Sequence, residues 1–78
     1  MHIAVLGAGA WGTAIAAHAA RYHSVMVLAR DQALADTINT HHQNPRYLPD
    51  APLPETLIAS THLADVLEHA KTGLTVIA

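Results

Sequence analysis

The sequence contains no cysteine and no phenylalanine, and only four of its 78 residues are lysine or arginine. Without cysteine, the chain has no disulfide and no thiolate metal site. Six acidic residues leave a net charge of −2, so the basic surface of a general nucleic-acid-binding protein is missing and no nucleic-acid partner is expected. Charged residues make up 13% and hydrophobic residues 51% of the chain. This composition argues against disorder, which requires low hydrophobicity and high charge.

Long hydrophobic runs are also missing. No apolar run approaches the roughly 20 residues that cross a bilayer, so no membrane span is expected. The first ten residues, MHIAVLGAGA, have the small residues of a secretory cleavage site, but they carry no lysine or arginine and their apolar stretch is short. We therefore expect this segment to be part of the folded protein, and the protein to be cytoplasmic.

Small apolar side chains take the place of the missing aromatic ones. Sixteen residues are alanine, whereas aromatic residues make up only 4% of the chain. The length is below the roughly 100–150 residues of a common domain, so the chain is one small domain or a piece of a larger one. Its core must consist of small, closely packed side chains.

Short apolar runs alternate with helical patterns along the chain. Apolar runs at residues 2–6, 24–29, 56–60 and 74–78 predict four strands. Helices are predicted over residues 12–22, after an N-cap at Asp31, and after an N-cap at Thr61. The strands are continuously apolar, which is typical of parallel sheets covered on both faces. The sequence therefore predicts an α/β fold, part of a Rossmann-type doubly wound parallel sheet with about four strands and three helices.

Two further patterns concern packing. Four prolines fall between residues 45 and 54, so residues 42–55 are predicted to be a loop. Apolar residues at helical spacing predict two buried stripes. Their members are Leu34 with Ile38, and Leu63 with Val66 and Leu67.

A glycine motif follows the first predicted strand. Residues 7–12 read GAGAWG and fit the pattern G-x-G-x-x-G, with a strand before it and a helix after it. In such a loop Gly7 allows the tight turn, Gly9 leaves room for a pyrophosphate, and Gly12 lets the helix lie close to the sheet. The helix N-terminus offers free N–H groups and a positive dipole end to phosphates. The motif predicts dinucleotide binding; the alternative is a glycine-rich turn without a ligand.

The end of the second predicted strand distinguishes between two cofactors. An acidic residue about 20 residues beyond the glycine loop is typical of NAD sites, whereas an arginine there suits the 2′-phosphate of NADP. This chain has Arg30 followed by Asp31. Arg30 can pair with a phosphate, and Asp31 is better explained as a helix cap than as a ribose ligand. These residues favour NADPH and leave NAD open.

Three segments together carry a family resemblance. They are MHIAVLGAGAWGTAIA at the N-terminus, LARD at residues 28–31, and NPRYLPDAPLPETL at residues 44–57. The glycine loop is shared by many dehydrogenases, but Trp11 before Gly12 and the run NPRYLP are much more specific. The chain resembles the NAD(P)-dependent sn-glycerol-3-phosphate dehydrogenases of bacterial type. The resemblance extends over essentially all 78 residues, which correspond to the N-terminal segment of the family's dinucleotide-binding domain, without the substrate domain.

The resemblance implies a set of cofactor contacts. They fall on Ala10 and Trp11 in the glycine loop, on Arg30 and Asp31 after the second strand, and on Tyr47 in the proline-rich loop. With the three glycines of the motif, these residues are the expected cofactor-binding set. Asp31 stands where some members of the family carry a second basic residue.

The resemblance also implies an activity. Members of this family are oxidoreductases that reduce dihydroxyacetone phosphate to sn-glycerol 3-phosphate for phospholipid synthesis, so a small-molecule substrate is the expected partner. Their catalytic lysines and substrate-phosphate site lie downstream of the matching region. We therefore expect no catalytic residue in these 78 residues and no turnover by this chain alone. The oligomeric state is left open, with a homodimer as one candidate.

Other interpretations of the sequence remain as alternatives. Seven histidines are present, but their spacings do not suit a shared metal ion, so no metal site is expected. A second hypothesis is a freestanding dinucleotide-binding or regulatory module without catalysis. A third is a related dehydrogenase with another small substrate, against which the NPRYLP run argues.

Overall fold

Strands and helices alternate along the whole chain in the computed structural model, which describes residues 1–78. The elements are β1 (His2–Leu6), α1 (Ala10–Ala19), β2 (Ser24–Leu28), α2 (Gln32–His41), β3 (Ile58–Ser60), α3 (Leu63–His69) and β4 (Leu74–Ile77). All four expected strands and three expected helices are present, and each strand lies within two residues of its expected bounds.

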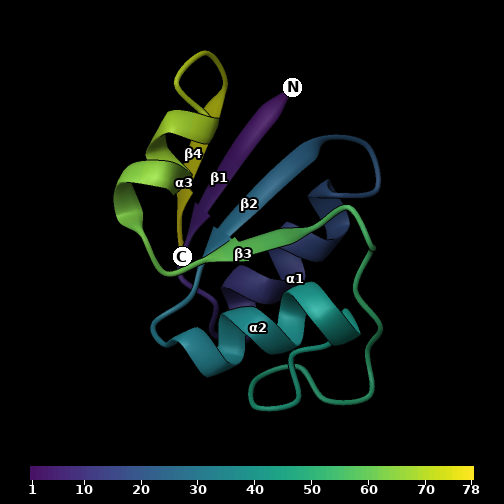
Figure 1. The fold of residues 1–78 in the computed structure, drawn as a ribbon. Coiled ribbons are helices and arrows are strands. Elements are labelled where there is room, and N and C mark those ends of the chain that lie inside the picture. Colours follow the sequence, from purple (N-terminus) through teal and green to yellow (C-terminus); the bar gives the residue numbers. More distant parts are fainter.

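The four strands form one parallel sheet in the order β3-β2-β1-β4 (Figure 1). Parallel neighbours need crossover connections, and the three helices supply them. α1 and α2 pack on one face of the sheet, and α3 packs on the other. The chain therefore winds outward from β1 to β3 and returns across the sheet to β4, which is the doubly wound arrangement of a Rossmann-type fold. The predicted fold class is confirmed.

The larger core lies between the sheet and the helices α1 and α2, and it contains fourteen buried residues. Successive strand side chains point to opposite faces of a sheet, so only alternate residues of β1 and β2 reach this core. Six of the fourteen residues are alanine and none is aromatic, as the composition predicts. The larger members are Ile3, Val5, Val25, Val27, Leu34, Ile38, Leu53 and Leu57.

The smaller core lies under α3, where only Ala4, Val66 and Ala70 are buried. The expected stripe on this helix is therefore wrong at two of its three positions, because Leu63 and Leu67 are 48% and 42% exposed. Residues that follow one another in a helix are about 100° apart around its axis. The buried stripe is centred on Val66 and Ala70, and no second helix packs on this face to cover the leucines beside it.

Two helices begin at other residues than expected. α1 begins at Ala10 instead of Gly12. Gly12 therefore lies inside the first turn, where close packing requires a glycine, and it does not interrupt the helix. α3 has His62 as its N-cap, without a capping side chain, and the expected cap Thr61 does not fill this role. The Ser60 hydroxyl instead accepts a hydrogen bond from the His62 N–H.

The segment between α2 and β3 contains no helix and no strand, as its prolines predict. It begins at His42, which ends α2 in the left-handed conformation with φ 55°. Leu53 and Leu57 anchor the segment in the larger core. None of the three helices has the length and hydropathy that a membrane crossing requires.

Candidate dinucleotide-binding site

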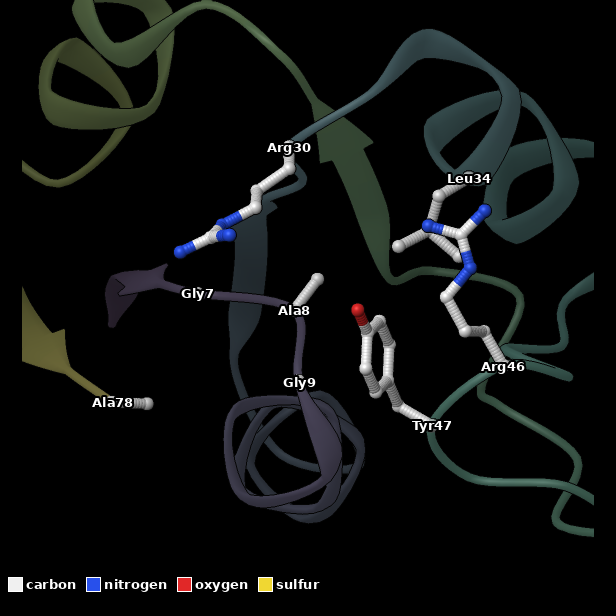
Figure 2. Close-up of a pocket in the computed structure, with 8 residues that line it drawn as sticks. All are labelled: Gly7, Ala8, Gly9, Arg30, Leu34, Arg46, Tyr47 and Ala78. Carbon is white, nitrogen blue, oxygen red and sulfur yellow. The ribbon is translucent and has the colours of Figure 1, made fainter.

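A pocket of about 380 Å³ opens at the carboxyl ends of β1, β2 and β4 (Figure 2). The glycine loop forms its floor, and Ala78 after β4 lies at one side. Arg30 follows β2, whereas Arg46 and Tyr47 reach the pocket from the proline-rich loop. In open α/β sheets, ligands bind at the carboxyl ends of the strands, at the point where the order of the strands reverses. This pocket lies at that point, between β1 and its two neighbours.

The glycine loop has a conformation that other residues would not adopt. Gly7 has φ +128°, outside the range that side-chain-bearing residues prefer, so it makes the turn from β1 toward α1. A Cβ atom on Gly12 would run into the backbone carbonyl of Gly7. The first turn of α1 is therefore packed directly on the turn that precedes it.

Gly9 is different, because a Cβ atom added there meets no atom within 4 Å. Its backbone is extended, with φ −72°, so the fold itself does not require a glycine. Gly9 is also the N-cap of α1, and no side chain caps this helix. The first N–H groups of a helix have no partner within it. The open space above Gly9 thus lies next to uncapped donors at the positive end of a helix, an arrangement that favours anions.

A buried amide joins the glycine loop to the proline-rich loop. Asn44 is completely buried, and its Nδ2 donates hydrogen bonds to the Ala8 carbonyl at 3.0 Å and to Thr13 Oγ1 at 2.8 Å. Thr13 donates in turn to the same Ala8 carbonyl at 3.1 Å. The Asn44 side-chain oxygen accepts from the Tyr47 N–H at 3.2 Å. One side chain therefore fixes the position of both loops that border the pocket.

This network also determines the direction of one peptide group. The chain contains no cis peptide bond, and the C=O and N–H of a trans peptide point in opposite directions. Because the Ala8 carbonyl points toward Asn44 and Thr13, the N–H of Gly9 points away from them. Asn44 and Thr13 are not among the site residues predicted from the sequence. In the sequence these are only two polar residues, Thr13 directly after the glycine motif and Asn44 at the start of NPRYLP. Their contact is seen only in the fold.

Arg30 is exposed at the pocket and forms neither a hydrogen bond nor an ion pair within the chain. In Figure 2 its guanidinium group extends over the glycine loop near Gly7. A guanidinium group has five N–H donors. All of them are free to contact an anion in the pocket.

Asp31 caps α2, as predicted, and accepts a hydrogen bond from the Leu34 N–H at 2.8 Å. Its other carboxylate oxygen pairs with Arg46 Nη1 at 2.9 Å. The hydrogen bond from Leu34, and after it the one from Arg46, hold the pKa of Asp31 below its usual value. The same carboxylate raises the pKa of Arg46. Arg46 lines the pocket, although it is not among the site residues predicted from the sequence.

The structure brings four of the eight expected site residues together around the pocket, namely Gly7, Gly9, Arg30 and Tyr47. The other four, Ala10, Trp11, Gly12 and Asp31, are close in sequence to the pocket but do not line it. Trp11 is 81% exposed on the first turn of α1. The chain has no cluster of three or more histidine or acidic side chains with the geometry of a metal site.

Comparison with known proteins places these features in a family. A family model described as NAD-dependent glycerol-3-phosphate dehydrogenase N-terminus matches residues 2–78. A relative from Stenotrophomonas maltophilia, named glycerol-3-phosphate dehydrogenase (NAD(P)+), is 52% identical over 69 residues, which are 87% of this chain and 20% of that protein. A relative of the same name from Xanthomonas campestris is 49% identical over 76 residues, which are 96% of this chain and 22% of that protein.

Solved structures agree with the sequence comparison. The glycerol-3-phosphate dehydrogenase of Saccharomyces cerevisiae has a TM-score of 0.86 at 29% identity, covering 100% of this chain and 26% of that one. The enzyme of Coxiella burnetii has a TM-score of 0.77 at 43% identity, covering 87% of this chain and 22% of that one. The chain thus spans about a fifth of the length of the curated relatives it matches. By the match over residues 2–78 it belongs to the NAD-dependent glycerol-3-phosphate dehydrogenase family, in the N-terminal region.

Proposed function

We propose that this chain binds a nicotinamide adenine dinucleotide, NADP or NAD, in the pocket at the carboxyl ends of β1, β2 and β4. The observation that carries the proposal is the open space above Gly9, which lies beside the uncapped N-terminus of α1. A pyrophosphate there would accept hydrogen bonds from backbone N–H groups and would face the positive end of the helix dipole. The residues present therefore fit the group.

Arg30 and Tyr47 are the proposed contacts of the adenosine end. Both line the pocket, and in Figure 2 the Tyr47 hydroxyl points into the space between Arg30 and Arg46. A guanidinium group suits the 2′-phosphate of NADP better than the 2′-hydroxyl of NAD. The proposal therefore favours NADPH over NADH. Ala10, Trp11 and Gly12 are proposed to contribute through the first turn of α1.

The proposed parent activity is that of a glycerol-3-phosphate dehydrogenase, in which the bound nicotinamide supplies hydride for the reduction of dihydroxyacetone phosphate. In that activity this chain binds and orients the dinucleotide. We propose that residues 1–78 are the N-terminal segment of a dinucleotide-binding domain, and that the catalytic and substrate-binding groups belong to the remaining length of the relatives. We also propose a cytoplasmic location for the protein, with a homodimer as one candidate assembly.

Calorimetric titration of the 78-residue chain with NADPH and with NADH tests the binding proposal. We expect saturable binding at one site per chain for both, with NADPH the tighter ligand. Heat that does not saturate with either nucleotide would contradict the proposal. A freestanding module and an enzyme segment both predict binding, so this titration does not distinguish between them.

An activity assay tests the remaining part of the proposal. The chain is mixed with NADPH and dihydroxyacetone phosphate, and the absorbance of NADPH is followed. We expect no oxidation of NADPH above the rate without protein, because the proposed catalytic groups belong to the remaining length of the relatives. Steady oxidation that depends on dihydroxyacetone phosphate would place catalytic groups within the chain and overturn this part.

A further inference from the structure

We propose that Arg46 is a second determinant of cofactor specificity, which binds the 2′-phosphate of NADP(H), and that Asp31 restrains it by competing for its guanidinium group. This inference rests on the proposed dinucleotide binding. It adds a residue of the proline-rich loop to the contacts that follow β2.

The first support is the charge of the pocket. Among the residues that line it, the charged ones are Arg30 and Arg46, and none is acidic. The whole chain has only four lysine and arginine residues, so half of its permanent cations lie at this pocket. Figure 2 shows the two arginines on opposite sides of the Tyr47 hydroxyl. Two guanidinium groups at one pocket suit a ligand with more negative charge than a pyrophosphate alone carries.

The second support is the state of Asp31. One of its carboxylate oxygens accepts from the Leu34 N–H, and the other pairs with Arg46. An NAD site of the common kind uses an acidic residue after the second strand to accept a hydrogen bond from the ribose 2′-hydroxyl. Both oxygens of this carboxylate already have partners within the chain. Asp31 thus serves the helix and the arginine, and the ribose hydroxyl has no free acidic partner here.

The third support is the freedom of Arg46 itself. Its side chain is 54% exposed. Its guanidinium group donates one hydrogen bond, from Nη1 to Asp31, and lies 5.9 Å from the centre of the Tyr47 ring. The other N–H donors of the group are unused within the chain, and an exposed ion pair in water is weak. A phosphate dianion carries more charge than the carboxylate and can accept from two donors at once, so it can draw Arg46 away from Asp31.

Four proteins test the inference, namely the wild type and the variants Arg46→Gln, Asp31→Asn and Arg21→Gln. Asparagine remains a good N-cap, so Asp31→Asn removes the charge that competes for Arg46 while α2 keeps its cap. Arg21 is exposed and does not line this pocket, so Arg21→Gln is the control for the loss of one positive charge. Thermal unfolding without nucleotide verifies that each variant is folded.

The readout is the ratio of the dissociation constants for NADH and NADPH, measured by titration at fixed salt. For Arg46→Gln we expect NADPH to bind about tenfold more weakly, because a charge-assisted hydrogen bond is lost, while NADH binding changes less than about twofold. For Asp31→Asn we expect tighter NADPH binding and an unchanged affinity for NADH. Arg21→Gln should leave the ratio as it is in the wild type.

The outcomes separate the two proposals. A ratio that is the same in Arg46→Gln and in the wild type would overturn the role of Arg46 and leave dinucleotide binding intact. Failure of the wild type to bind either nucleotide would remove both proposals. Inorganic phosphate, added as a competitor at the concentration of NADPH, should not displace it. Displacement at equal concentration would assign the arginines to free phosphate instead of the 2′-phosphate.

Discussion

The two faces of the sheet differ in how they are covered. α1 and α2 bury a core of fourteen residues on one face, whereas α3 buries three on the other. Large apolar side chains remain exposed on α3 and at strand positions of the second face, including Ile58, Leu63, Leu67 and Ile77. The pocket is built from the elements of the first face together with the carboxyl ends of the strands (Figure 2). The well-packed half of the chain is therefore the half that carries the site.

The face with the larger core is also the face on which the glycine loop has to be rigid. A phosphate-binding loop must hold its N–H groups in fixed directions, since a pre-organised site loses less entropy on binding. On the first face, the buried amide of Asn44 and the close packing of Gly12 provide this fixation. On the second face, α3 is only seven residues long and contributes no residue to the pocket. Changes in the stability of the α3 side of the sheet should therefore have little effect on nucleotide affinity.

The largest expected effect is the difference in stability loss between one substitution on each face of the sheet. Ile38 of α2 is 1% exposed, whereas Leu67 of α3 is 42% exposed. Truncating a buried isoleucine to alanine costs about 2–5 kcal/mol, so Ile38→Ala should lower the free energy of unfolding by that amount. Leu67→Ala should cost less than about 1 kcal/mol, because 42% of the residue is already exposed to water in the folded chain. Urea unfolding measures both. Equal losses would show that the two faces do not differ in packing as described.

The next effect concerns the buried amide. Asn44→Ala removes the donor to the Ala8 carbonyl and the acceptor for the Tyr47 N–H. The Ala8 carbonyl then keeps only the hydrogen bond from Thr13, and the loss of the acceptor for the Tyr47 N–H costs about 1–3 kcal/mol of stability. Because the glycine loop loses its fixed orientation, NADPH binding should also weaken by about tenfold.

Asn39→Ala is the matched control for that variant. Asn39 is also an amide that bridges two segments, since it exchanges two hydrogen bonds with the backbone of Ala59 on β3. It does not line the pocket. We expect a loss of stability similar to that of Asn44→Ala and no change in nucleotide affinity of the folded protein. If both variants bind NADPH equally well, Asn44 has only a structural role.

The smallest expected effect is a pH dependence. The hydrogen bonds from Leu34 and Arg46 lower the pKa of Asp31 in the folded chain. A lowered pKa stabilises the folded state at pH values above the unfolded pKa, and this contribution is lost as the pH falls through the folded value. The melting temperature of the wild type should therefore exceed that of Asp31→Asn at neutral pH. The gap should narrow below about pH 4, and a gap that is constant between pH 2 and 7 would exclude this contribution.

Local patterns in the sequence predict most of the fold. The apolar runs, the N-cap at Asp31 and the glycine motif each depend on neighbouring residues, so the strands, α2 and the turn after β1 can be predicted without tertiary information. The exposure of Leu63 and Leu67 cannot, because helical spacing gives the apolar residues but not the neighbours that cover them. The start of α1 at Ala10 also depends on a packing contact that spacing alone does not give, that of Gly12 with the turn at Gly7.

The site is only partly predictable for the same reason. The glycine motif and Arg30 stand at positions that a strand–turn–helix pattern defines. Asn44 and Arg46 contact Ala8 and Asp31, which are 36 and 15 residues away along the chain. Such contacts exist only once the proline-rich loop has folded back onto the sheet. The run NPRYLP therefore marks a specific segment without giving its role.

The most direct test of dinucleotide binding at this pocket is the NADPH affinity of Gly9→Val. A Cβ atom at Gly9 would meet no protein atom within 4 Å, and the backbone there is extended. The free energy of unfolding of the variant should therefore lie within about 1 kcal/mol of that of the wild type. Its isopropyl group would occupy the space proposed for the pyrophosphate. Ala14→Val, on the exposed side of α1, is the control. We expect Gly9→Val to fold and to lose NADPH binding while Ala14→Val retains it. Wild-type affinity in a folded Gly9→Val would contradict dinucleotide binding at this pocket.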